Sequence, residues 1–315
     1  MDLSLRPMST SQILDKTFSL YRENFLLFAG IAALPPACFL VGRFLMLWSG
    51  HSMAGATPAA VLAAGLVVFL AVLGLGILWL VGYALASGAS VYAVSRFHLG
   101  YTTTIAEAYR LVMPYFRRIV GIVALLFLGL IVVAFVLVMV FAVFIGVMTV
   151  AGGRTTSPIG VIIVTILVAI PTAALFLYLS AVFSLSIPAC VLEKLGVIDS
   201  LNRSIALTRG SRGRLVLVNL LAAILSFVMG MVLGIPTIIG VARLGSNAPA
   251  MMPFLMWQYV ADFIGGCLSF PIATIAVCLI YYDERVRKEA FDLQLMMETV
   301  GQQPPAAPPG SPAIG

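Results

Sequence analysis

The feature that most constrains this chain is a series of six apolar stretches, each long enough to cross a lipid bilayer. A helix needs about 20 apolar residues to span the hydrocarbon core. Inside lipid the backbone must satisfy its own hydrogen bonds, so such stretches fold as helices. The sequence therefore predicts an all-α, polytopic transmembrane protein with six spans. Their approximate bounds are 25–48, 58–95, 119–151, 158–192, 214–242 and 253–282.

Composition excludes a water-soluble domain of ordinary type. Only 10% of the 315 residues are charged and 62% are hydrophobic, whereas a soluble domain carries roughly 25% charged residues. The net charge of +6 does not indicate nucleic acid, because the Lys and Arg residues lie beside apolar runs and form no basic stripe. We expect membrane lipids, anionic ones included, as partners.

The basic residues also predict an orientation, because loops on the cytoplasmic side of a membrane carry an excess of Lys and Arg. If the amino terminus lies inside, fifteen of the eighteen Lys and Arg residues fall in cytoplasmic segments. Only Arg43, Arg154 and Arg243 then lie on or toward the outer side. The sequence therefore places both termini in the cytoplasm, with short and nearly uncharged outer connections.

Four parts follow from this topology. Residues 1–24 form a cytoplasmic amphipathic segment, and residues 25–282 form the membrane domain. Residues 283–301 are expected to form a further cytoplasmic helix, and the Pro-rich tail 302–315 is expected to be disordered. The amino terminus has no early apolar core or cleavage site, so the first span is expected to direct insertion.

A threefold plan is suggested by short amphipathic segments that precede each pair of spans. Asp15, Glu107 and Asp199 occupy similar places in these segments and stand 92 residues apart at each step. This spacing favours three repeated hairpins, each preceded by an interfacial amphipathic helix on the cytoplasmic side. The alternative is that any hairpin protein needs charged cytoplasmic joints and that the equal spacing is coincidental.

Two charged residues, Arg43 and Asp262, are expected to lie within the spans. A carboxylate at such depth is costly and needs a partner. We interpret the two as a candidate intramembrane ion pair that joins the first and sixth spans. The alternative is a carboxylate linked to protons or substrate in a small-solute transporter, which would also use spans broken by proline. These prolines are Pro35, Pro36, Pro171, Pro188, Pro236 and Pro271.

A second candidate site is the cluster of charges at the cytoplasmic ends of the later spans. It is either a simple positive-inside anchor or a surface that binds a phosphate-bearing lipid, a soluble ligand or a protein partner. The residues of this candidate surface are Glu193, Lys194, Asp199, Arg203, Arg209, Arg212, Arg214, Asp283, Arg285, Arg287 and Lys288.

Residues arranged for catalysis are not found in the sequence. It contains no Ser-His-Asp set, no HExxH motif, no P-loop and no group of carboxylates spaced to hold a divalent ion. The four cysteines lie in or beside apolar segments without ligand spacing, and are expected to be small packing residues. We therefore expect no catalytic, cofactor-binding or metal-binding residues, and no enzymatic activity.

Three segments resemble a known family. They are IPACVLEKLGVIDSLNRSIALTRG (187–210), YYDERVRKEAFDLQLMM (281–297) and RPMSTSQILDKTFSLYRENF at the amino terminus. Together they are similar to the prokaryotic six-span proteins grouped with the membrane domain of glycerophosphoryl diester phosphodiesterases. The resemblance implies the cytoplasmic (inner) membrane of a prokaryote.

In some members of that family a separate soluble domain performs the hydrolysis. No such domain follows residue 282 in this sequence, so the resemblance carries no catalytic residue over. The function expected from the sequence is a non-catalytic scaffold, or a unit that binds lipid or a partner, in lipid or envelope metabolism. The alternative is a small-solute transporter or permease that uses Asp262.

Overall fold

The computed structural model describes residues 8–51, 58–98, 100–151, 158–244 and 248–289, and within them it is all-helical, with no strand. The helices are α1 (Thr10–Glu23), α2 (Phe25–Ala32), α3 (Leu34–His51), α4 (Pro58–His98), α5 (Ile105–Val112), η1 (Met113–Tyr115), α6 (Phe116–Ala151), α7 (Pro158–Phe183), α8 (Ser186–Leu192), α9 (Val197–Thr208), α10 (Arg212–Leu244) and α11 (Ala248–Glu289).

The membrane class predicted from the sequence is confirmed. Among the described residues, five segments are long and apolar enough to cross a membrane, and a bent pair of helices makes a sixth if it counts as one span. The five segments are Ala63–Phe97, Ile105–Val143, Ala169–Leu192, Arg212–Leu244 and Ala250–Glu289. The bent pair is α2 and α3, whose axes meet at 46°.

The cytoplasmic helix predicted after the sixth span is only partly covered. Its first residues, 283–289, continue α11 without a break. The remainder of that segment, 290–301, and the predicted disordered tail, 302–315, lie outside the described residues, as does the start of the amino-terminal segment, 1–7.

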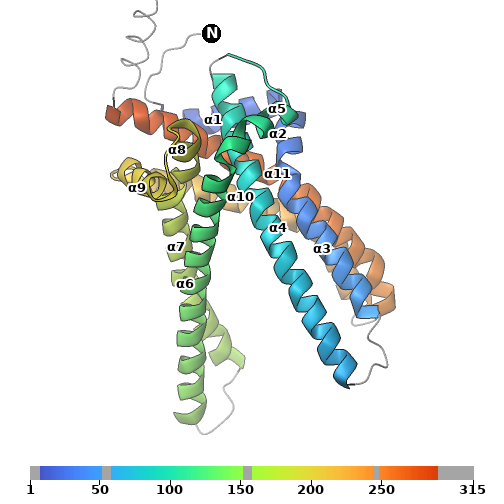
Figure 1. Cartoon of the computed structure of the whole chain (residues 1–315). Helices are drawn as coiled ribbons and strands as arrows, with labels where there is room; N and C mark the ends of the chain where they lie inside the picture. The colour runs from blue at the N-terminus through green and yellow to red at the C-terminus, as the bar shows by residue number, and fades with distance from the viewer. Residues whose placement is uncertain (1–7, 52–57, 99, 152–157, 245–247, 290–315) are drawn as a thin grey trace, which may run out of the picture.

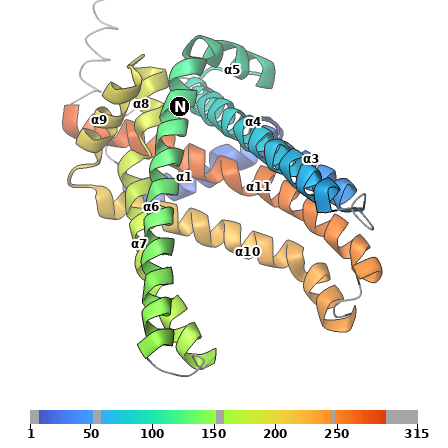
Figure 2. The same ribbon diagram turned by 60° about the horizontal axis from the view of Figure 1, so that its bottom comes forward.

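The short helices gather at one end of the molecule. In Figure 1, α1, α5, α8 and α9 lie together with the last turns of α11, while the long helices extend away from them. We call this the charged end. Figures 1 and 2 both show the antiparallel pair α6 and α7 diverging from α3, α4 and the far part of α11.

The bend between α2 and α3 is caused by a proline, and a side chain from another helix satisfies the carbonyl group that the proline leaves free. Pro35 has no backbone N–H, so it cannot donate to the carbonyl oxygen of Ile31 one turn earlier, and its ring opposes a straight helix there. The Tyr109 hydroxyl of α5 donates to that freed carbonyl at 2.7 Å. A side chain from the second short helix therefore satisfies the break in the first span.

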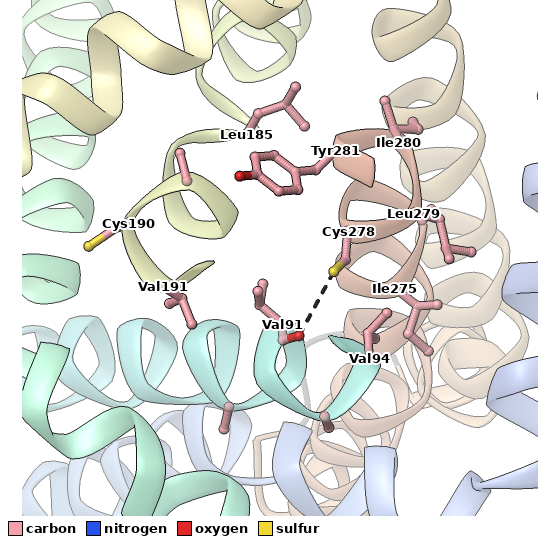
Figure 3. Close-up of a cluster of buried hydrophobic side chains, with 14 of the residues drawn as sticks. Val91, Val94, Leu185, Cys190, Val191, Ile275, Cys278, Leu279, Ile280 and Tyr281 are labelled. Atoms are coloured by element: carbon pink, nitrogen blue, oxygen red, sulfur yellow. Dashed lines mark hydrogen bonds between the residues drawn. The ribbon is translucent and has the colours of Figure 1, made fainter. Parts of the chain in front are cut away.

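Most of the buried core lies at the charged end. Small residues of α4, including Ala86 and Ala89, allow close approach of neighbouring helices there. Figure 3 shows Leu185 beside Tyr281 of α11, which is fully buried. The core side chains labelled with them are Val91, Val94, Cys190, Val191, Ile275, Cys278, Leu279 and Ile280.

Away from that end the long helices expose apolar side chains. The most apolar 18-residue stretch of α4 contains no buried residue. Phe69, Phe135 and Phe227, on three different helices, are each more than 60% exposed. Soluble monomers rarely expose apolar patches of more than a few hundred Å², so lipid is the solvent that fits this surface.

Two glycines of α4 provide a test of the packing. A methyl group at Gly88 would lie 2.8 Å from Val112 Cγ1 and 2.9 Å from Ile119 Cδ1, whereas one at Gly74 would meet nothing within 4 Å. We expect Gly88→Ala to destabilise the protein by about 1–3 kcal/mol through overpacking. Gly74→Ala is the matched control and should leave stability unchanged or slightly higher. Thermal unfolding in detergent compares the two, and equal melting temperatures would contradict the packing described here.

Candidate functional site

The charged end contains two clusters of ion pairs on the last turns of α11. The first surrounds Glu193, the residue that directly follows α8 and caps it. Arg203 of α9 contacts the Glu193 carboxylate through Nε at 2.9 Å, and the Tyr281 hydroxyl donates to it at 2.5 Å. Arg203 also pairs with Glu289, and Arg285 lies between the two carboxylates, 3.8 Å from Glu193 and 3.1 Å from Glu289.

The charges of this Glu193 cluster balance, with two carboxylates and two guanidinium groups. Burial acts to lower the pKa of Arg203, but its hydrogen bonds and charge interactions with Glu193 and Glu289 outweigh burial and raise that pKa. Arg203 is therefore a permanent cation that fixes α9 against α8 and α11.

The second cluster surrounds Asp283, whose side chain is fully buried. Its carboxylate accepts from Arg214 Nη1 at 2.5 Å, from Arg287 Nε at 2.8 Å and from the backbone N–H of Met8 at 2.6 Å. The same two arginines donate to the Met8 carbonyl oxygen at 3.0 and 2.7 Å. One carboxylate thus joins the start of α10, the end of α11 and the residue just before the cap of α1.

Lys288, one turn after the buried Glu284, completes this cluster. Its ammonium lies 3.2 Å from the Glu284 carboxylate. It also donates to the carbonyl oxygens of Leu207 and Arg209 at the end of α9. A cation in this place satisfies the open carbonyls of a helix carboxyl terminus and opposes the negative end of its dipole.

The structure therefore divides the eleven residues of the predicted surface into two groups. Eight of them hold contacts within the protein: seven belong to the two clusters, and the eighth is Arg212, whose Nη1 donates to the Tyr178 hydroxyl at 2.6 Å. The other three, Lys194, Asp199 and Arg209, are exposed, and their side chains make no hydrogen bond or ion pair among the described residues. Most residues of the predicted surface therefore make contacts within the protein.

Arg43 of α3 and Asp262 of α11 meet far from the charged end. Arg43 Nη1 lies 2.5 Å from Asp262 Oδ2, and the two side chains are 43% and 39% exposed. Gln258 Nε2 donates to the other carboxylate oxygen at 2.8 Å, and the guanidinium lies 5.2 Å from the centre of the Tyr259 ring. Asp262 therefore has a partner on each oxygen.

Two hollows adjoin these groups. A groove of about 660 Å³ runs between α10 and α11, with Gln258 and Asp262 at one side and Gly230 and Gly234 among its mostly apolar lining. A smaller hollow of about 540 Å³ lies at the charged end. We call it the basic basin; its lining residues are Arg209, Gly210, Ser211, Gly213, Arg214, Glu284, Arg287 and Lys288.

Several contact residues had no distinct signal in the sequence. Tyr281 takes part through a hydroxyl group that no motif marks, and Met8 takes part through its backbone. Glu284 and Glu289 fall within the charged run after the sixth span, where they could have been added to the predicted surface. Among the described residues, no group of three His, Cys, Asp or Glu side chains is placed to hold a metal ion.

Comparison with protein-family models, with curated proteins and with solved structures gives no match. The family resemblance drawn from the sequence motifs therefore stays a prediction.

The Glu193 cluster predicts a large effect of a single substitution. Glu193→Ala leaves Arg203 without its nearest carboxylate and Tyr281 without its acceptor, so we expect a loss of about 3 kcal/mol. Asp15→Asn, which removes an exposed carboxylate of α1 at the same end, should change stability by less than about 0.5 kcal/mol. Thermal unfolding in detergent measures both. A Glu193→Ala variant as stable as Asp15→Asn would show that the cluster does not hold the helices together.

Proposed function

We propose that this chain is a non-catalytic membrane scaffold in the cytoplasmic membrane of a prokaryote. Its long helices anchor it in lipid. Its charged end faces the cytoplasm and binds anionic lipid or a protein partner, in lipid or envelope metabolism. The proposed relation to the membrane domain of glycerophosphoryl diester phosphodiesterases favours such a role, because in some members of that family a separate soluble domain performs the hydrolysis.

One observation carries the proposal: ion pairs within the protein fix the charged end as a rigid platform, and few of its charged side chains remain available to bind a partner. The carboxylates of the two clusters pair with arginine and lysine side chains of the same clusters, and the buried core adjoins them. An exposed cation, Arg209, and the basic basin stand on this platform. A rigid surface with a small set of free charges suits binding, because little further ordering is needed when a partner arrives.

The order of the helices supports the proposed threefold plan. A short helix precedes two long segments three times along the chain, with α1, α5 and α9 in the equivalent places. Each short helix also exposes a large apolar side chain: Phe18 on α1, Ile105 on α5 and Ile198 on α9, which are 48%, 39% and 60% exposed. Such side chains suit helices that lie in a membrane interface. The three helices would then form a belt on the cytoplasmic leaflet.

Native mass spectrometry of the full chain, extracted in mild detergent, tests the proposal. We expect the protein to retain an anionic lipid or a protein subunit after detergent is removed from the complex in the gas phase. A monomer that releases neither, but that releases a small polar solute, would overturn the scaffold and favour transport.

Transport is the second candidate, and the groove between α10 and α11 is the observation that favours it. Its volume lies in the range of small-molecule sites, and Asp262 and Gln258 are polar groups in an otherwise mostly apolar lining. A solute-linked carboxylate would need to exchange its partners during the cycle. In the structure both oxygens of Asp262 already have partners, so the structural ion pair is the interpretation we adopt.

A double-mutant cycle separates these two roles of Asp262. If the pair is structural, Asp262→Asn should lower the stability in detergent by about 1 kcal/mol, because both side chains are partly exposed. Adding Arg43→Gln should then cost little more, since the interaction is already lost. The transport role requires unchanged stability together with loss of solute flux in proteoliposomes.

A further inference from the structure

The basic basin lies where three helix ends meet. The chain leaves α9 at Thr208, turns through Arg209, Gly210 and Ser211, and begins α10 at Arg212. Gly210 has a φ of +85°, in the left-handed region that suits glycine, and this permits the tight turn. The last turns of α11 close the remaining side of the basin through Glu284, Arg287 and Lys288.

Its lining is positively charged. Four cations line the basin, namely Arg209, Arg214, Arg287 and Lys288, against one carboxylate, Glu284. Glu284 is already neutralised, because Lys288 lies at 3.2 Å and Arg214 at 3.7 Å from its oxygens. Asp283, behind the lining, compensates Arg214 and Arg287 in turn. Counting both carboxylates against the four cations leaves two positive charges in excess, and Arg209 is the lining cation whose side chain has no partner among the described residues.

Unused hydrogen-bond capacity is concentrated at the same place. The backbone N–H groups of Arg212 and Gly213, in the first turn of α10, have no partner among the described residues. No acidic residue occupies that turn, and a methyl group at Gly213 would meet nothing within 4 Å, so the backbone is not covered. Among the lining residues, the buried Nε of Arg214 is a further donor without a hydrogen-bond partner in the described part of the chain.

The polarity at the start of α10 is not cancelled by the helix before it. Lys288 occupies the negative carboxyl end of α9 by bonding its last carbonyls. The positive amino end of α10 therefore faces the basin without an opposing dipole, and an anion is the group it would stabilise. Guanidinium groups match phosphate oxygens in geometry as well as in charge.

From these observations we infer that the basic basin is a binding site for a phosphate group, with Arg209 as its principal side-chain donor. The inference rests on the proposed function and names the ligand of the charged end. The basin stands where α10 enters and α11 leaves the apolar region, and the buried residues Leu215 and Val218 follow within two turns. This depth suits the headgroup of an anionic phospholipid, and the same chemistry would also accept a soluble phosphate ester.

Three single variants of the full chain test the site. Arg209→Gln removes the free guanidinium and leaves the hydrogen bonds of Arg209 in place, because those among the described residues use its backbone N–H and carbonyl groups. Arg209→Lys keeps the charge and loses the guanidinium fork. Arg117→Gln is the matched control: it removes an exposed cation of α6 that has no hydrogen-bond or ion-pair partner among the described residues.

The first measurement is native mass spectrometry with phosphatidylglycerol titrated into the detergent-solubilised protein, with phosphatidylcholine as the uncharged reference. We expect the wild-type protein to bind one phosphatidylglycerol molecule more tightly than it binds any further lipid molecules. Arg209→Gln should weaken that binding about tenfold, as for a lost charge-assisted hydrogen bond. Arg209→Lys should show a smaller loss, and Arg117→Gln less than about a twofold loss.

The second measurement identifies the source of the phosphate. Melting temperature is recorded with inorganic phosphate and with glycerol phosphate in the absence of added lipid. A rise that Arg209→Gln abolishes supports the site with a soluble ligand, and lipid retention without such a rise supports the site with a headgroup.

Failure of the phosphate site can be distinguished from failure of the proposed function. Equal lipid binding by Arg209→Gln and Arg117→Gln, with no phosphate effect on melting, overturns the basin but leaves the scaffold standing. A wild-type protein that retains neither lipid nor partner overturns the proposed function itself.

Discussion

The buried carboxylate of Asp283 is the group on which the charged end depends. A fully desolvated charge costs several kcal/mol unless it is matched by well-placed donors. Its three donors come from Arg214, Arg287 and the backbone of Met8, which lies 275 residues away in the chain. Removing either arginine would take away a charge-assisted hydrogen bond, and removing the Met8 N–H would leave the buried carboxylate short of a donor. The beginning of α1, the start of α10 and the end of α11 are therefore obliged to meet, and the hairpins between them must return to the same end.

Lipid explains why the core stops where it does. Between helices in a bilayer there is no hydrophobic driving force, since lipid chains are as apolar as the side chains they would replace. Burial is consequently deepest where the chain meets polar surroundings and where small residues such as Ala86 and Ala89 permit contact. The diverging long helices in Figures 1 and 2 fit this account, because lipid can solvate the apolar faces between them.

Hydropathy was sufficient to predict the helical membrane class, because the requirement for internal backbone hydrogen bonds leaves one solution for long apolar stretches. The partner of Asp262 could also be predicted, since Arg43 is one of few charges outside the segments predicted to be cytoplasmic. The sequence indicates where most charged residues of the two clusters gather but does not indicate which of them pair. Glu193 and Tyr281 stand 88 residues apart, and the Met8 contacts use backbone atoms that carry no residue-specific signal. Likewise Pro35 signalled a bend, but nothing in the sequence indicated that Tyr109 would satisfy it.

The division between paired and unpaired charges bears on what the charged end is for. A pure positive-inside anchor would need only cations near the headgroups, and their pairing would be of no consequence. Most charged side chains of the charged end pair with one another, so the electric field outside the protein comes from the few unpaired groups. These groups lie together, because Arg209 and the unpaired backbone N–H groups at the start of α10 border the same basin. Because the surrounding ion pairs already fix the backbone, a phosphate bound there would meet donors in place, which favours a specific contact over diffuse attraction to anionic lipid.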